Sequence, residues 1–123
     1  MPELPEVETI CRGLGLRLTG RGLRRVWQQP TKLRQPLPAD LAARLEGRRV
    51  LRVGRRAKYL LLELDDGTVV LIHLGMTGRL VVSAAPAGVP GRHDHVVLET
   101  DDGAVVTFND ARRFGLIELT QRD

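Results

Sequence analysis

The stretch 59-YLLLELDDGTVVLIHL-74 decides the expected fold, because it reads as two β-strands joined by a tight turn. Tyr59–Leu64 and Thr68–Leu74 are rich in leucine, valine and isoleucine, and Asp65-Asp66-Gly67 separates them. Asp-Gly between two such runs is a strong signal for a β-hairpin. This segment therefore predicts an antiparallel pair of strands with a buried side.

A second stretch of the same kind lies further along the chain. Asp101-Asp102-Gly103 separates Val96–Thr100 from Ala104–Phe108, which predicts another hairpin. The two Asp-Asp-Gly segments resemble each other. Independent use of the same turn residues in two hairpins explains this as well as an internal duplication does. Four further strands are expected at Leu23–Gln28, at Arg49–Gly54, after Gly78 and after Gly115.

Two helices complete the expected pattern. From Pro5 to Gly20 the apolar residues recur at helical spacing and form one stripe, made of Val7, Ile10, Cys11, Leu14 and Leu18. Pro5 suits the first helical position, and Gly20 suits the end of the helix. A short second helix is expected at Ala39–Leu45. The predicted fold is mostly β with α: a two-layer β-sandwich of about eight antiparallel strands flanked by two helices, the long one N-terminal, in a single domain over residues 1–123.

The composition narrows the class of protein. With 42% hydrophobic and 28% charged residues among 123, the sequence is typical of a globular protein. It carries a net charge of +4, and 17 of its 19 cationic residues are arginines, so nucleic acid is a reasonable partner. The single Cys11 excludes an intrachain disulfide and a cysteine-rich metal site. We find no membrane-spanning or signal pattern, and expect a cytoplasmic monomer.

Pro2 is the first residue that could carry chemistry. Removal of Met1 would expose a secondary amine, which is less protonated than lysine at neutral pH and can attack a sugar C1′. Glu3 beside it could move a proton, and Glu6 lies one helical turn further on. The alternatives are that Met-Pro is merely a common start, and that Glu3 and Glu6 complement the helix dipole.

Three residues of the predicted hairpin region are further candidates. Strand alternation places Lys58 with Leu60 and Leu62 on the inward face, which is costly unless the lysine meets an anion, opens into a cleft or extends to the rim. The glycines around Met76 suggest a tight loop that projects this side chain. Alone, His73 would more often be a core histidine and Met76 a core filler.

Two other segments contain candidate functional residues. His93 and His95 could suggest a metal, but the sequence supplies no convincing third ligand, so we expect none. In 109-NDARRFG-115, Arg112 and Phe114 make a basic turn with an apolar tip, as in proteins that part stacked bases. The alternative is a basic hairpin end with Phe114 in the core.

Taken together, these motifs resemble one family. MPELPEVET, RRAKYLL, IHLGMTG, HDH and ARRFG, in this order, are similar to the formamidopyrimidine-DNA glycosylases, bacterial repair enzymes for oxidised purines. The resemblance runs through essentially the whole chain. Leu4 favours this purine branch over the endonuclease VIII branch for oxidised pyrimidines, which typically has Gly there.

The resemblance implies a role for each candidate. It implies a bifunctional DNA glycosylase and abasic-site lyase that removes formamidopyrimidine and 8-oxoguanine from damaged double-stranded DNA by β,δ-elimination. The catalytic residues would be Pro2 as Schiff-base nucleophile, Glu3 as acid, Glu6 as supporting carboxylate and Lys58 as proton donor. The DNA-binding residues would be His73, Met76, His93, Arg112 and Phe114, of which Met76, Arg112 and Phe114 enter the duplex.

The sequence departs from the family in two respects, and Met1 adds a separate condition. Ala111 stands where the family often has Pro. The family continues into a helix–two-turn–helix motif and a four-cysteine zinc finger, which this chain lacks, so one zinc is expected only in that missing part. While Met1 is attached, the Pro2 nitrogen is a tertiary amide without nucleophilicity. We therefore expect this chain to be weak or inactive by itself, and a non-catalytic DNA-binding module remains an alternative.

Overall fold

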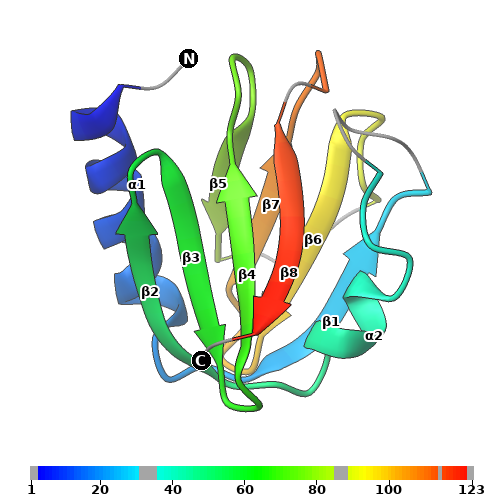
Figure 1. Cartoon of the computed structure of the whole chain (residues 1–123). Helices are drawn as coiled ribbons and strands as arrows, with labels where there is room; N and C mark the ends of the chain where they lie inside the picture. The colour runs from blue at the N-terminus through cyan, green and yellow to red at the C-terminus, as the bar shows by residue number, and fades with distance from the viewer. Residues whose placement is uncertain (1–2, 31–35, 85–88, 114, 122–123) are drawn as a thin grey trace.

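The computed structural model consists of two four-stranded antiparallel sheets packed face to face, with one helix along each side (Figure 1). It describes residues 3–30, 36–84, 89–113 and 115–121. The elements in chain order are α1 Leu4–Leu18, β1 Leu23–Gln28, α2 Leu41–Leu45, β2 Val50–Arg56, β3 Tyr59–Leu64, β4 Thr68–His73, β5 Arg79–Ser83, β6 Asp94–Thr100, β7 Val105–Asn109 and β8 Leu116–Gln121. The predicted sandwich of eight strands with two flanking helices is confirmed.

The sheets have the strand orders β1-β6-β7-β5 and β2-β3-β4-β8. Both predicted hairpins are present, with β3 paired to β4 and β6 paired to β7. Gly67 and Gly103 have φ of 88°, a conformation that glycine adopts readily, which is why Asp-Gly forms both turns. Differences from the predicted bounds are small: β2 continues to Arg56, and α2 begins two residues late, at Leu41.

Helix α1 lies along β2 and buries the predicted apolar stripe. Val7, Cys11, Leu14 and Leu18 are buried, while Ile10 is partly buried against the same core. The helix begins one residue earlier than predicted, so Pro5 occupies its second position rather than its first. Proline is tolerated at both positions, because neither backbone N–H has a partner within the helix. The stripe fixes the face that α1 turns to the sheet, and so the direction in which its N-terminus points.

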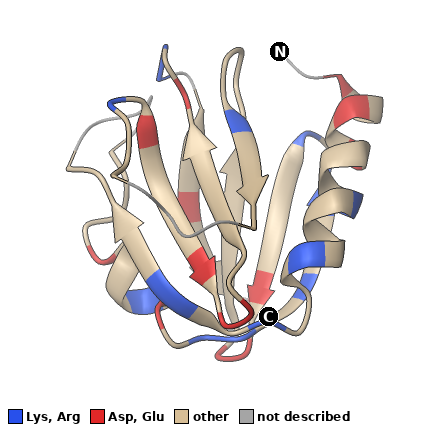
Figure 2. Ribbon diagram, turned by 180° about the vertical axis from the view of Figure 1, so that it is seen from behind, with Lys and Arg blue, Asp and Glu red and all other residues tan. Residues whose placement is uncertain are grey.

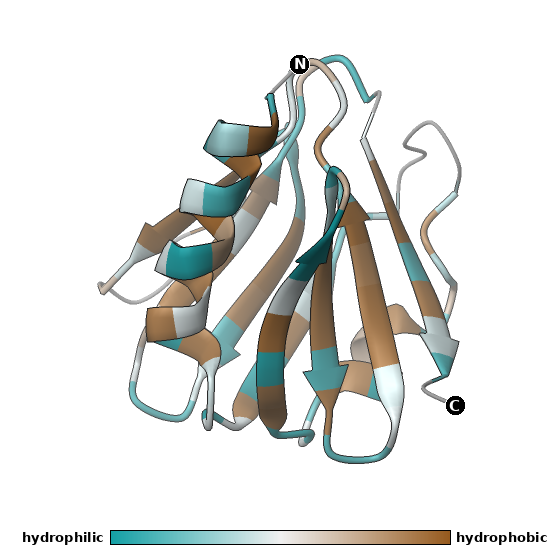
Figure 3. Ribbon diagram, turned by 60° about the vertical axis from the view of Figure 1, so that its left-hand side comes forward, coloured by the Kyte–Doolittle hydropathy of each residue, from teal (hydrophilic) through white to brown (hydrophobic). Residues whose placement is uncertain are grey.

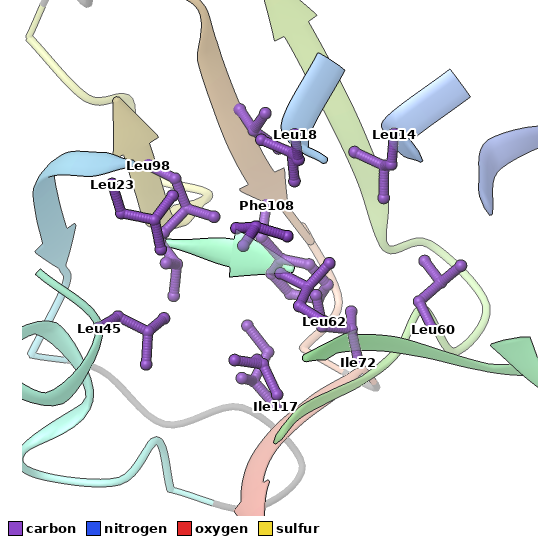
Figure 4. Packing of buried hydrophobic residues seen from close by; sticks show 14 of the residues in the cluster. Leu14, Leu18, Leu23, Leu45, Leu60, Leu62, Ile72, Leu98, Phe108 and Ile117 are labelled. Carbon is purple, nitrogen blue, oxygen red and sulfur yellow. The ribbon is translucent and has the colours of Figure 1, made fainter. Parts of the chain in front are cut away.

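One core joins the two sheets and both helices. It is built mainly from leucine and valine, with Phe108 as its aromatic member in the described residues (Figure 4). In Figure 3 the strands are largely brown, the hydrophobic colour, while the turns at the end opposite the N-terminus are teal. Within the described part of the chain, no helix is long and apolar enough to cross a membrane.

The topology sorts the connections into two ends of the sandwich. The start of α1, the β2–β3 turn, the β4–β5 loop, the start of β6 and the β7–β8 loop lie at one end, drawn at the top of Figure 1. We call this the loop end. The two Asp-Asp-Gly turns lie at the opposite end, which we call the Asp-Gly end. Side chains from five separate segments can therefore meet only at the loop end.

Candidate nucleic-acid interface and active site

The candidate site residues that the structure describes all lie at the loop end. Glu3 and Glu6 are at the start of α1. The remaining described candidates are Lys58 in the β2–β3 turn, His73 at the end of β4, Met76 in the β4–β5 loop, His93 before β6 and Arg112 in the β7–β8 loop. Pro2 and Phe114 lie outside the described residues. Segments far apart in the sequence thus share one end of the fold.

Glu3 is the N-cap residue of α1, and Glu6 closes the first turn behind it. The Glu6 Oε1 atom accepts a hydrogen bond from the Glu3 backbone N–H at 3.4 Å. This is one half of a capping box, and a carboxylate here also complements the positive end of the helix. Glu6 therefore has a structural role of the kind that its alternative interpretation predicted. The Glu3 side chain is 72% exposed and remains available for other partners.

Lys58 is not part of a core-facing row, so that prediction is wrong. Arg56 pairs with Tyr59, and Ala57 and Lys58 form the two-residue turn between β2 and β3. A turn breaks the side-chain alternation of a strand, and Ala57 has a φ of 51°. The Lys58 side chain is 32% exposed, and its Nζ lies 3.7 Å from Glu3 Oε2. The lysine thus meets an anion at the rim, next to the N-terminus of α1.

Arg55 connects this turn to α1. Its Nε donates to Glu8 Oε1 at 2.8 Å, and its Nη1 donates to the Ala57 carbonyl at 2.9 Å. The hydrogen bonds from Arg55 and then Arg12 lower the pKa of Glu8. The Glu8–Arg12 pair has the i,i+4 spacing that can be read from a sequence. The contact between Arg55 and Glu8 spans 47 residues, and the sequence did not predict it. Through it, the Lys58 turn is held beside Glu3.

The β4–β5 loop projects Met76 as predicted. Met76 is 57% exposed, which excludes the core-filler interpretation. A side chain on Gly78 would place its Cβ 2.2 Å from the Leu74 carbonyl oxygen, so the tight loop requires glycine there. His73 is half-buried rather than a core residue: its Nδ1 accepts from the Gly75 N–H at 3.1 Å, and its ring lies 5.1 Å from that of Tyr59.

The two histidines near the start of β6 differ in their surroundings. His93 is half-buried, and its Nδ1 has no hydrogen-bond partner among the described residues. His95 is fully buried beside Phe108, with its Nε2 2.8 Å from the Asp110 carbonyl oxygen. In the described part of the chain, no three His, Cys, Asp or Glu side chains are grouped so that they could hold a metal ion.

The β7–β8 loop exposes Arg112, and its backbone is bound to the β4–β5 loop. The Arg112 N–H donates to Thr77 Oγ1 at 3.3 Å. Arg113 is also exposed and has a φ of 62°, while Ala111 is exposed. Figure 2 shows acidic and basic positions mixed at this end. The carboxylate of Asp94 there accepts from Gly91 N and Asn109 Nδ2, however, so it is turned to the protein while arginines face solvent.

Comparison with known proteins identifies the family. Residues 1–117 match the family described as Formamidopyrimidine-DNA glycosylase N-terminal domain. The chain belongs to this family. Two curated formamidopyrimidine-DNA glycosylases, from Cereibacter sphaeroides and Geobacter sulfurreducens, are each 54% identical to it, over 97% and 100% of this chain. The resemblance expected from the five motifs is confirmed.

Solved formamidopyrimidine-DNA glycosylases have the same fold. A Lactococcus lactis enzyme bound to DNA containing an abasic site has a TM-score of 0.85 at 30% identity, over 98% of this chain. The same bacterium's enzyme with DNA containing Fapy-dG has a TM-score of 0.84 at 30% identity, over 97% of this chain. The chain spans under half the length of these relatives, 44% of the Cereibacter protein and 45% of the first Lactococcus chain.

Proposed function

We propose that this chain is the catalytic N-terminal domain of a base-excision repair enzyme. The enzyme would be a bifunctional DNA glycosylase and abasic-site lyase that removes formamidopyrimidine and 8-oxoguanine from damaged duplex DNA. One observation carries the proposal: the Glu3–Lys58 pair lies at the N-terminus of α1, at the same end as exposed Met76 and Arg112. The family membership and the DNA-bound Lactococcus enzymes support it.

In the proposed reaction, the nucleophile is the Pro2 amine after removal of Met1. Its lone pair forms a bond to C1′ of the damaged nucleotide, and the bond between C1′ and the base breaks with the electron pair going to the base. The leaving base takes a proton, which Glu3 can supply directly or through water. The Pro2 nitrogen then loses its proton, and its lone pair forms a double bond to C1′ as the C1′–O4′ bond breaks and O4′ takes a proton, which Glu3 can supply. The product is an iminium ion that links Pro2 to the opened sugar.

The iminium ion then allows elimination. Loss of a C2′ proton moves electrons toward the iminium nitrogen and breaks the C3′–O3′ bond, so the 3′ phosphate leaves; a second elimination releases the 5′ phosphate. Lys58 is placed to donate or accept protons beside Glu3, and its cation suits a nearby phosphate. No step uses zinc. The described residues offer no set of ligands for it, and we place the family's zinc in the region that follows in the relatives.

The remaining residues are proposed to open the duplex. Chemistry at C1′ requires the nucleotide to leave the base stack, at a cost of a few kcal/mol. Exposed Met76 and Arg112 would fill the space that it leaves, and Phe114 would part the neighbouring bases. His73 and His93 would contact the backbone. The partner is then damaged double-stranded DNA, bound by a monomer.

Borohydride trapping on duplex DNA that contains 8-oxoguanine or an abasic site tests this proposal. Mass spectrometry first establishes that Met1 is absent. We expect a covalent adduct that retained Met1 blocks and that Pro2→Gly, a weaker primary amine, reduces. Glu3→Gln should lower trapping on 8-oxoguanine by about 100-fold, and much less on a preformed abasic site, where base loss is bypassed. Asp65→Asn, at the Asp-Gly end, is the matched control and should leave trapping on both substrates unchanged.

The enzyme proposal would be overturned if processed protein gave no adduct in two forms: this chain alone, and this chain extended by the region that follows in the relatives. Binding to damaged DNA without an adduct, weakened in Phe114→Ala, would instead favour a DNA-binding module. Preferential trapping on oxidised pyrimidines would place the chain with endonuclease VIII.

A further inference from the structure

Asp110 is a buried carboxylic acid that the proposed mechanism does not use. It follows β7 directly and has 0% exposed surface. Burying a carboxylate is costly unless hydrogen bonds replace its water. Among the described residues, Asp110 forms no ion pair with a lysine or arginine, so its partners must be neutral donors.

Three such donors surround the Asp110 side chain. Gly115 N–H donates to Oδ2 at 2.7 Å, while Arg113 N–H at 3.0 Å and Thr77 Oγ1 at 2.5 Å both donate to Oδ1. Both oxygens therefore act as acceptors. Two of the donors belong to the β7–β8 loop, and the third belongs to the β4–β5 loop.

The backbone of Asp110 reaches a third segment. Its N–H donates to the His93 carbonyl at 3.0 Å, and its carbonyl oxygen lies 2.8 Å from His95 Nε2. The segment before β6 is thereby joined to the same residue. All three segments that carry the DNA-contact candidates Met76, His93 and Arg112 meet at Asp110.

Thr77 links the two loops a second time. Its hydroxyl donates to Asp110 and accepts from the Arg112 N–H at 3.3 Å. Met76 is the residue before Thr77, so one hydroxyl sets the spacing between the methionine and the arginine. The backbone at Gly115 is closely packed against both loops, because a Cβ there would lie 2.8 Å from the His73 carbonyl oxygen and 2.9 Å from Asp110 Oδ2.

We infer that Asp110 is a positioning residue that holds the Met76 loop and the Arg112 loop as one preformed unit for insertion into damaged duplex DNA. The inference rests on the proposed function and names a residue that acts through others rather than on the substrate. Side chains that replace an extruded nucleotide must already be in place, since ordering two loops at that moment would add to the cost of extrusion. Asp110 removes this cost in advance.

Asp110→Asn is the direct test, because it keeps the shape of the side chain. Its amide nitrogen must face either the Gly115 N–H or the Arg113 N–H, so at least one donor loses its acceptor. Amide hydrogen exchange of residues 75–78 and 111–113 should speed up by at least about tenfold. Asp102→Asn is the matched control: Asp102 also accepts from a threonine hydroxyl, that of Thr100, but lies at the Asp-Gly end.

Trapping separates positioning from chemistry. In processed protein, Asp110→Asn should lower trapping on an 8-oxoguanine duplex at least about fivefold more than trapping on a single-stranded abasic oligonucleotide, which needs no insertion. Thr77→Val should likewise lose more trapping on the 8-oxoguanine duplex than on the single-stranded abasic oligonucleotide. Thr77→Ser, which keeps the hydroxyl, should trap on both substrates in the same ratio as the unsubstituted protein. If Asp110→Asn fails to fold, the Thr77 pair still decides.

The outcomes for the inference and for the proposed function are distinct. Unchanged loop exchange, or an equal loss of trapping on both substrates, would overturn the role of Asp110 and leave the enzyme proposal standing. If the unsubstituted protein gives no adduct on any DNA, the proposed function fails. In that case, faster amide hydrogen exchange of the two loops in Asp110→Asn would show that Asp110 couples the loops, but not that they act on DNA.

Discussion

The two ends of the sandwich are held together in different ways. At the Asp-Gly end each turn is closed by its own residues: Asp66 Oδ1 accepts from the Thr68 N–H at 3.0 Å, and Asp102 Oδ1 accepts from Thr100 Oγ1 at 2.5 Å. These side-chain partners are two residues apart in the sequence, while the turn backbones also meet distant segments: the Asp65 N–H donates to the Arg49 carbonyl and the Asp101 N–H to the Gly22 carbonyl, both at 2.9 Å. Asp side chains close turns in this way from local sequence.

At the loop end the bonds run between distant segments. Thr77 and Asp110 are 33 residues apart, and Arg55 and Glu8 are 47 apart. These contacts exist only after both sheets and α1 have assembled. The side-chain hydrogen bonds at the end bearing the proposed site thus join distant segments, whereas the side-chain hydrogen bonds that close the two Asp-Gly turns are local.

The largest expected effect is the loss of the Asp110 carboxylate. Asp110→Ala leaves three donors without acceptors in one buried and two part-buried hydrogen bonds, each worth on the order of 1 kcal/mol, so the free energy of unfolding should fall by about 3 kcal/mol. Asp102→Ala should cost clearly less, because water reaches its exposed turn. Urea unfolding of both variants measures the difference, and equal losses would contradict the distinction between the ends.

A smaller effect is expected from crowding the loop end. Gly115→Ala introduces a Cβ 2.8 Å from the Phe108 ring and from the His73 carbonyl oxygen, and overpacking of this kind costs about 2 kcal/mol. Gly54→Ala is the matched control, since its Cβ would meet nothing within 4 Å. Thermal unfolding compares the two. A Gly115→Ala protein as stable as Gly54→Ala would show that the loop end adapts more easily than its contacts imply.

The smallest expected effect is the acid sensitivity of the Asp-Gly end. The Thr68 backbone N–H lowers the pKa of Asp66, and the Thr100 hydroxyl lowers the pKa of Asp102. Because the folded pKa values lie below the unfolded ones, these groups stabilise the protein fully above about pH 5 and progressively less as pH falls below about 4. The destabilisation caused by Asp102→Asn should therefore shrink between pH 7 and pH 3 in urea titrations. A loss independent of pH would contradict the assignment.

The contrast between the ends also explains what could be predicted from the sequence. Period-two and helical patterns, with Asp-Gly turns, predicted six strands and α1 to within two residues and placed the other two strands after Gly78 and Gly115, because these signals are local. Lys58 was misplaced because alternation was extended one residue into a turn. Asp110 and Arg55 were missed because their partners lie tens of residues away. The family motifs named the exposed site residues, but not the buried carboxylate beneath them.

We propose that the loop end, and not the Asp-Gly end, meets damaged DNA. Amide hydrogen exchange of the chain with and without a duplex that contains a tetrahydrofuran abasic-site analogue tests it most directly. We predict slower exchange at residues 75–77, 91–93 and 110–113, with an undamaged duplex protecting them less, and no change at 65–67 and 101–103. Protection centred on the Asp-Gly turns, or on the outer face of either sheet, would show that the loop end does not meet the DNA.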